Sequence, residues 1–127
     1  MPLARIDLVR GKSAQYRRVI GDVVYEAIVG ILKAPAHDRF QVITEHAPEN
    51  HIADETYLGI KRTGDCVFIQ LTLNAGRTLE QKKAFYQAVA DGLHDKLGIR
   101  REDVLISLVE VAKENWSFGN GVAQYAS

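Results

Sequence analysis

In this chain of 127 residues, Pro2 is the residue whose type and position most clearly suggest a role in catalysis. A proline at this position commonly permits removal of the initiator Met1, and Pro2 then carries a terminal secondary amine. Such an amine is a base near neutral pH, an acid when protonated, and able to form an iminium with a carbonyl. The simpler interpretation is a proline that begins an edge strand. Pro2 alone does not distinguish a catalytic amine from a proline that begins a strand, so the other sequence features are needed.

Two basic residues occupy equivalent short turns, Gly11-Lys12-Ser13 and Gly76-Arg77-Thr78. A phosphate-binding loop is excluded because that motif needs a glycine five residues before its second one, where this chain has Ile6. Each turn instead predicts the start of a helix capped by Ser or Thr. Lys12 and Arg77 then lie between a strand and a helix N-terminus, where anionic ligands commonly bind.

The two turns belong to an internal repeat with a constant offset of 65 positions (76 minus 11). A repeat of this kind indicates architecture more firmly than local propensity does. The repeat spans about residues 2–46 and 67–111 of one domain, 1–127. Four further pairs keep the same offset: Leu8 and Leu73, Leu32 and Leu97, Asp38 and Asp103, Glu45 and Glu110.

Within each copy the apolar period changes from two to 3.6 and back, which predicts strand, helix, strand. The first helix begins at Ser13 and ends before Pro35. The second begins with a capping box formed by Thr78 and Gln81 and ends at Gly98. The expected strands cover residues 3–8, 40–46, 66–73 and 104–111.

The predicted fold class is α/β (α+β), with two fused β-α-β units forming a four-stranded sheet and both helices on one face. Right-handed crossovers make the strands of each unit parallel. Both second-copy strands carry apolar residues on their two faces. We therefore expect the uncovered face of the sheet to be apolar and to be covered by another subunit.

Acidic and aromatic residues supply the remaining candidates. Asp38 has a plain role as a turn residue before a strand, its counterpart Asp103 has only that role, and position alone does not separate the two. Trp116, Phe118 and Tyr125 lie in a glycine-rich tail without a helical or strand period. They could wall a ligand pocket or pack into a neighbouring subunit.

Composition excludes several classes of function. Sixteen basic residues balance sixteen acidic ones, so no net charge favours nucleic acid or an acidic membrane. No apolar run is long enough to span a membrane, and no signal peptide precedes the first strand, which predicts a cytoplasmic protein. The single cysteine, Cys66, lies in an apolar run and is expected to be a buried thiol.

No cofactor or metal is expected. Seven residues between positions 37 and 55 could suggest a metal site, but no pair has the spacing of a zinc motif and no cysteine is near. They are His37, His46 and His51 together with Asp38, Glu45, Asp54 and Glu55.

Several of these features together resemble the tautomerase superfamily, and most of all its malonate semialdehyde decarboxylase branch. They are Pro2 before the first strand, the two Gly-[Lys/Arg]-[Ser/Thr] turns, the strand Ile43-Thr44-Glu45 and the closing Trp116-Ser117-Phe118-Gly119-Asn120-Gly121. The resemblance implies a homotrimer that acts on a small oxo acid. It also implies catalytic roles for Pro2, Asp38 and Arg77, with Arg77 binding the substrate carboxylate against a wall of Trp116, Phe118 and Tyr125.

The expected activity is decarboxylation of a 3-oxo acid such as malonate semialdehyde. One departure from the branch matters, because its decarboxylase has a second arginine where this chain has Ala75. Two alternatives stay open: a keto-enol tautomerase of 2-oxo acids such as phenylpyruvate, and a trimeric binding protein without activity.

Overall fold

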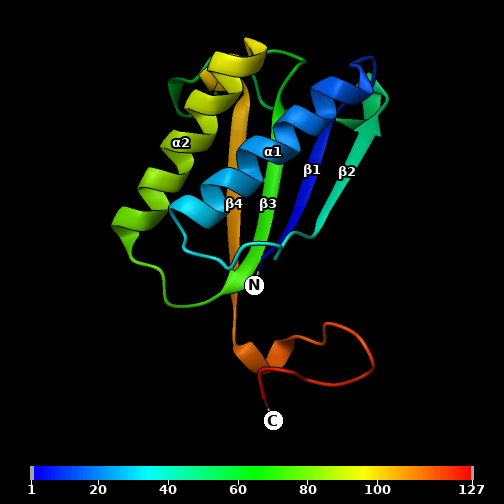
Figure 1. Ribbon diagram of the computed structural model, residues 1–127. Helices are drawn as coiled ribbons and strands as arrows, with labels where there is room; N and C mark the ends of the chain where they lie inside the picture. The colour runs from blue at the N-terminus through cyan, green and yellow to red at the C-terminus, as the bar shows by residue number, and fades with distance from the viewer. Residues whose placement is uncertain (1, 127) are drawn as a thin grey trace.

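Two consecutive strand-helix-strand units make up the computed structural model, which describes residues 2–126 (Figure 1). The strands lie in the order β2-β1-β3-β4. β1 pairs with β2 and β3 with β4 in parallel, while β1 and β3 join the units antiparallel, which confirms the predicted fold class. The elements are β1 (Leu3–Val9), α1 (Ala14–Gly30), β2 (Gln41–His46), β3 (Val67–Asn74), α2 (Leu79–Leu97) and β4 (Val104–Val111).

Both helices begin at the predicted caps, α2 ends at the predicted Gly98, and α1 ends at Gly30, before Pro35. The Ser13 side chain accepts a hydrogen bond from the Tyr16 backbone N–H. Thr78 and Gln81 form the reciprocal capping box of α2. Gly98 ends α2 in the left-handed region at φ 68°, a conformation that glycine adopts without strain.

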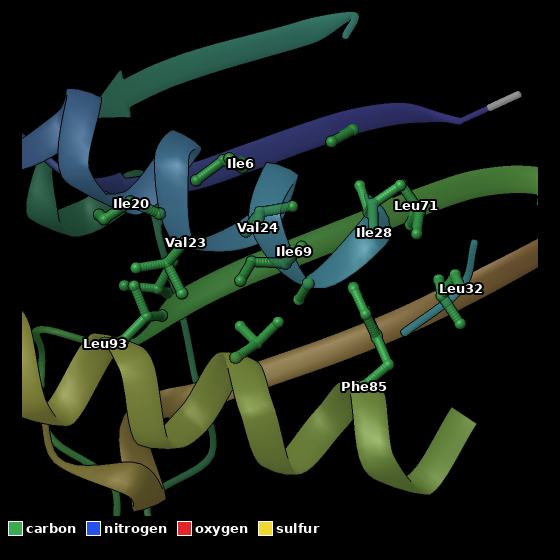
Figure 2. Close-up of a cluster of buried hydrophobic side chains, with 14 of the residues drawn as sticks. Ile6, Ile20, Val23, Val24, Ile28, Leu32, Ile69, Leu71, Phe85 and Leu93 are labelled. Carbon is green, nitrogen blue, oxygen red and sulfur yellow. The ribbon is translucent and has the colours of Figure 1, made fainter. Parts of the chain in front are cut away.

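α1 and α2 lie side by side on one face of the sheet, and the apolar core fills the space between the two layers (Figures 1 and 2). A Cβ atom on Gly92 of α2 would lie 2.8 Å from Val23 of α1, so the glycine permits this close approach. The largest fully buried apolar side chains are Ile6, Ile20, Val24, Leu32, Val67, Ile69, Leu71, Leu73, Phe85, Val89 and Leu93.

The other face of the sheet is mixed rather than apolar, so that part of the prediction was wrong. Successive side chains of a strand point to opposite faces, and residues paired across strands share a face. The pairing register therefore places polar and apolar residues together in the cross-strand rows of this face. One row runs Val42, Arg5, Gln70, Ser107, and the next runs Thr44, Asp7, Phe68, Leu105. Apolar side chains are exposed chiefly on the outer strands, including Val42, Leu105 and Val109.

The equivalence between the units reaches beyond residues 2–46 and 67–111. The ion pair between Arg17 and Glu45 at 3.1 Å has its counterpart, 65 residues later, between Lys82 and Glu110 at 2.6 Å. Each unit then continues through a matching sequence into a short 3-10 turn. These stretches are Ala47-Pro48-Glu49-Asn50-His51 and Ala112-Lys113-Glu114-Asn115-Trp116, with turns at Pro48–Asn50 and Lys113–Asn115.

Neither α1 nor α2 combines the length and the apolar character needed to cross a bilayer, and the same is true of every helix within residues 2–126.

Candidate active site

Four chain segments meet at one end of the sheet, the end where the N-terminus and the C-terminal segment lie (Figure 1). Pro2 precedes β1 and Asp38 precedes β2, while Asn74 ends β3 and Trp116 follows β4. The antiparallel pairing of β1 with β3 brings the starts of one parallel pair beside the ends of the other. The topology therefore gathers residues from both copies of the repeat.

Pro2 is buried and lines a cavity of about 220 Å³ at this end of the sheet. Trp116 and Phe118 form another wall, with their rings stacked at a centroid distance of 5.4 Å. Tyr125 packs edge-on against Phe118 at 5.1 Å from outside the cavity, so it supports the wall without lining it. The complete lining is Pro2, Leu3, Phe40, Trp116, Ser117 and Phe118.

Hydrogen bonds fix the C-terminal segment over the cavity. The indole Nε1 of Trp116 donates to Oδ1 of Asn74 at 2.8 Å. The Gln124 side chain accepts from the backbone N–H of Phe118 and donates to the carbonyl of Gly119, both at 2.9 Å. Of the two interpretations left open for Trp116 and Phe118, the chain itself therefore supports the pocket wall.

Asp38 is buried close to the start of β1. The backbone N–H of Ala4 donates to the carbonyl of Phe40 at 3.0 Å, and this parallel register brings Asp38 close to level with Pro2. Burial raises the pKa of the Asp38 carboxyl above its usual value, and the positive charge of Arg77 opposes that increase. Arg77 is therefore close enough to Asp38 for its charge to affect the pKa of the carboxyl.

The Arg77 guanidinium is held by two backbone carbonyls. Nε donates to Leu32 and Nη1 donates to Asn74, each at 3.1 Å. A guanidinium has five N–H donors, and the remaining ones on Nη1 and Nη2 make no hydrogen bond within residues 2–126. A carboxylate can bind this free edge in a bidentate manner.

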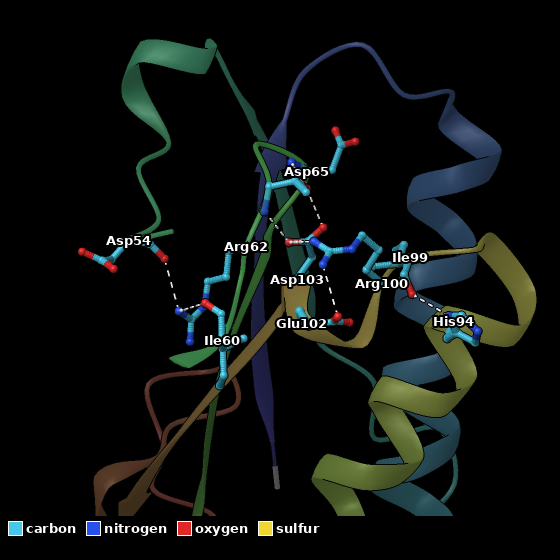
Figure 3. A network of polar contacts seen from close by, with 10 residues as sticks. Asp54, Ile60, Arg62, Asp65, His94, Ile99, Arg100, Glu102 and Asp103 are labelled. Carbon is cyan, nitrogen blue, oxygen red and sulfur yellow. Dashed lines mark hydrogen bonds and ion pairs between the residues drawn. The ribbon is translucent and has the colours of Figure 1, made fainter. Parts of the chain in front are cut away.

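The equivalent positions of the other copy lie at the opposite end of the sheet and form a different arrangement (Figure 3). Asp103, the counterpart of Asp38, is buried and accepts hydrogen bonds from the backbone N–H of Thr63 at 2.7 Å and from its hydroxyl at 2.5 Å. Lys12, the counterpart of Arg77, lies 3.6 Å from Asp65. Two residues of the loop before β3, Thr63 and Asp65, therefore contact the counterparts of Asp38 and Arg77.

The residue equivalent to Pro2 in the second copy, Val67, also differs from it. Val67 stands where the first copy has Pro2, and its nitrogen belongs to an internal peptide bond. No terminal amine can form there. The structure thus separates Asp38 from Asp103, which sequence position alone could not do.

Sequence reasoning missed four residues of this region: Leu3, Phe40, Ser117 and Asn74. Phe40 carried a usable signal, because a large aromatic residue lies two positions after Asp38 and directly before the predicted apolar positions of β2. Asn74 also carried one, because it is a polar residue two positions before the Gly76-Arg77-Thr78 turn, where the first copy of the repeat has Val9.

The histidines do not gather into one site. His46 contacts Asp7 at 2.6 Å and stacks on His51, whose Nε2 contacts the Cys66 carbonyl at 2.7 Å, whereas the backbone N–H of His37 bonds to the Tyr25 hydroxyl. Cys66 is buried, and burial raises the pKa of its thiol. Within residues 2–126, no group of three His, Cys, Asp or Glu residues is arranged to hold a metal ion.

The fold and the cavity define a β-α-β protein with a proline at the start of its first strand, and the comparisons identify the family. A family model described as "Tautomerase enzyme" matches residues 38–119, and a second model with the same description matches residues 2–60. The chain belongs to the tautomerase superfamily and is an enzyme of that superfamily.

Two relatives from Bacillus subtilis (strain 168) are each 38% identical to this chain. "Probable tautomerase YusQ" matches over 98% of both chains, and "Probable tautomerase YrdN" over 98% of this chain and 96% of its own. Both likenesses extend over nearly the full length.

The solved structures point to one branch. FG41 malonate semialdehyde decarboxylase, inhibited by 3-bromopropiolate, is 42% identical with a TM-score of 0.91, covering 97% of this chain and 93% of its own. A second malonate semialdehyde decarboxylase, described with decarboxylase and hydratase activities, is 32% identical with a TM-score of 0.90 over 97% and 95%. A fused 4-OT chain at 22% identity and a TM-score of 0.79 shares the fold.

Proposed function

We propose that this enzyme decarboxylates a small 3-oxo acid such as malonate semialdehyde, with Pro2 as the catalytic amine. The observation that carries the proposal is the buried Pro2 in a cavity walled by Trp116 and Phe118. The 42% identity to a malonate semialdehyde decarboxylase supports the substrate class. Removal of Met1, which lies outside the described residues, is a condition for this chemistry.

The reaction needs an electron sink next to the bond that breaks. Neutral Pro2 can attack the aldehyde carbon, and the carbonyl oxygen then takes up protons and leaves as water to give an iminium; alternatively, protonated Pro2 can polarise the carbonyl oxygen. The electron pair of the breaking C–C bond then moves into the iminium or the carbonyl, and CO2 leaves. Protonation of the enamine or enol carbon gives acetaldehyde, after hydrolysis in the iminium case.

Arg77 would bind the substrate carboxylate through the free edge of its guanidinium, and Asp38 would stabilise the cationic form of Pro2. The aromatic wall excludes water and strengthens both charge interactions. No metal or cofactor is required for this sequence of steps.

Keto-enol tautomerisation of a 2-oxo acid such as phenylpyruvate is the second candidate. In that reaction neutral Pro2 transfers a proton between carbon atoms while Arg77 still binds the carboxylate. Ala75 favours it, because the turn before α2 offers one arginine instead of the two of the decarboxylase branch. Two relatives named probable tautomerases support the same reading.

One experiment separates these functions and the binding protein without activity. Protein whose intact mass lacks one methionine is assayed for acetaldehyde and CO2 from malonate semialdehyde and for ketonisation of enol-phenylpyruvate. We expect faster turnover of the 3-oxo acid, with Pro2 mainly protonated at pH 7 in an NMR titration of labelled proline. Faster ketonisation favours the tautomerase, and turnover of neither substrate favours the binding protein.

The same proposal includes a homotrimer, for which the exposed Leu105 and Val109 on the open sheet face provide an apolar contact. Light scattering at micromolar concentration should give three times the chain mass of 14.2 kDa. Leu105→Arg should lower that mass because it places a charge in the contact. Leu79→Arg, on an exposed side chain of α2, is the matched control and should not. A monomeric mass for the wild type would contradict the trimer.

The two equivalent aspartates should respond differently to the same substitution. Asp38→Asn should lower kcat by about 100-fold, because the neutral amide no longer stabilises the cationic form of Pro2, with no loss of stability at pH 7. Asp103→Asn should leave kcat within about twofold and lower the free energy of unfolding by about 1.5–3 kcal/mol, because Thr63 loses a charged acceptor. Steady-state kinetics and urea unfolding measure the two effects.

The pH dependence of stability provides a check on Asp38. In protein that retains Met1, where the pKa of Asp38 is raised by burial, the folded state holds the proton more tightly than the unfolded chain, so stability decreases as pH rises through that window. Asp38→Asn should remove this decrease. An unchanged pH profile in the variant would contradict the assignment.

A further inference from the structure

We propose that Asn74 positions both the aromatic wall and the carboxylate-binding arginine of the site, through its side chain and its backbone respectively. Asn74 is the last residue of β3 and is 8% exposed. Its Oδ1 accepts the indole N–H of Trp116 at 2.8 Å, and its carbonyl accepts Nη1 of Arg77 at 3.1 Å. One residue therefore touches two groups that the proposed function assigns to substrate binding, and the inference rests on that function.

The hydrogen bond to Trp116 determines the orientation of the amide. An indole N–H is only a donor, so the oxygen of Asn74 must face it. The bond joins residues 42 positions apart and attaches the segment after β4 to the end of β3. Since Trp116 stacks on Phe118, the bond also fixes the second ring of the wall.

The carbonyl of Asn74 has a separate effect on Arg77. Together with the carbonyl of Leu32 it accepts one N–H from Nη1 and one from Nε, which leaves the other N–H groups of Nη1 and Nη2 for a carboxylate. Because the same residue also accepts the indole N–H, Asn74 connects the aromatic wall to Arg77, which does not itself line the cavity.

The other copy of the repeat indicates that the fold itself does not require an asparagine here. The residue 65 positions earlier is Val9, and His51, the counterpart of Trp116, bonds to the Cys66 carbonyl instead. A buried amide is unfavourable unless it is hydrogen bonded. The polar residue at position 74 therefore serves the site, and Asn74→Val is a substitution that the fold already tolerates at the equivalent position.

Trp116 is the single tryptophan of the chain, so its fluorescence reports directly on this bond. In Met1-free protein, Asn74→Val should increase acrylamide quenching of Trp116 and lower kcat/KM with malonate semialdehyde by about tenfold, the effect of one lost hydrogen bond. Asn74→Asp keeps the acceptor, so quenching should stay near wild type. Its negative charge beside Arg77 should raise KM more than it lowers kcat.

Thr72→Val is the matched control, because Thr72 lies on the same strand and face and its side chain makes no hydrogen bond within residues 2–126. It should change neither quenching nor kcat/KM. If Asn74→Val does not fold, Trp116→Phe removes the same N–H and should give the same tenfold loss. In a folded double variant the two losses should not add.

Unchanged quenching and unchanged kcat/KM in Asn74→Val would overturn the proposal, as would an activity loss without a change in quenching. Malonate, titrated against Trp116 fluorescence, separates this inference from the proposed function. If the wild type turns over no oxo acid yet Asn74→Val weakens malonate binding and exposes Trp116, the positioning role stands while the decarboxylase assignment fails.

Discussion

Pro2→Ala protein that has lost Met1 should turn over oxo acids about 100-fold or more slowly than wild type, while keeping its fold. Alanine leaves a primary amine, which differs from proline in basicity and shape and rotates freely. The proline ring is itself a buried wall of the cavity, so the substitution also enlarges the site. The measurement is kcat at saturating substrate, with circular dichroism and intact mass on the same sample.

The fold should survive because Pro2 precedes β1 and has no backbone N–H to contribute to the sheet. Pro48→Ala is the matched control, since Pro48 is an exposed proline at the start of a 3-10 turn. Its kcat should equal that of the wild type. Wild-type protein that retains Met1 should be as inactive as Pro2→Ala, because its proline nitrogen is an amide. Near-normal rates in Pro2→Ala would remove Pro2 from the mechanism.

Most of the fold could be predicted because local signals and the repeat agree. Caps at Ser13 and Thr78 and the glycine at position 98 mark the helix ends in the sequence, and the structure places the ends there. Strand boundaries shifted by one residue, as with β3, predicted over 66–73 and observed as Val67–Asn74. Strand ends depend on pairing partners, which local sequence does not specify.

The mixed open face could not be predicted from the second-copy strands alone. Arg5, Asp7 and Thr44 come from the first copy and enter the same rows as Phe68 and Leu105. The register between β1 and β3 is a long-range property. Without it, the polar contribution to this face could not be counted.

Part of the candidate site could also be predicted from the sequence, and part could not. Pro2, Trp116 and Phe118 line one cavity, whereas Tyr125 lies behind Phe118, and neither Asp38 nor Arg77 is part of the lining. The contact between Asn74 and Trp116 joins positions 42 apart, and no local period could indicate it. Side-chain hydrogen bonds between distant segments appear only when the fold is known.

Arg77→Lys should lower kcat/KM despite conserving the charge, and Arg77→Ala should lower it further. The guanidinium donates to the carbonyls of Leu32 and Asn74 through Nε and Nη1, and in the proposed mechanism its remaining N–H groups bind a carboxylate, which an ammonium cannot do at the same time. Loss of a charge-assisted pair costs about 1.5–3 kcal/mol, or roughly 10- to 150-fold in kcat/KM. Steady-state kinetics with malonate semialdehyde measure it, and urea unfolding accounts for the lost backbone contacts.

Lys12→Ala is the internal control for this prediction, because Lys12 has the place of Arg77 in the first copy of the repeat. Its ammonium lies 3.6 Å from Asp65, and Lys12 follows β1 whereas Pro2 precedes it, so the two lie at opposite ends of that strand. A loss confined to the Arg77 variants would tie the effect to the carboxylate-binding edge rather than to a basic residue before a helix. Equal losses in kcat/KM for Lys12→Ala and Arg77→Ala would mean that the choice of the second copy's basic residue is wrong.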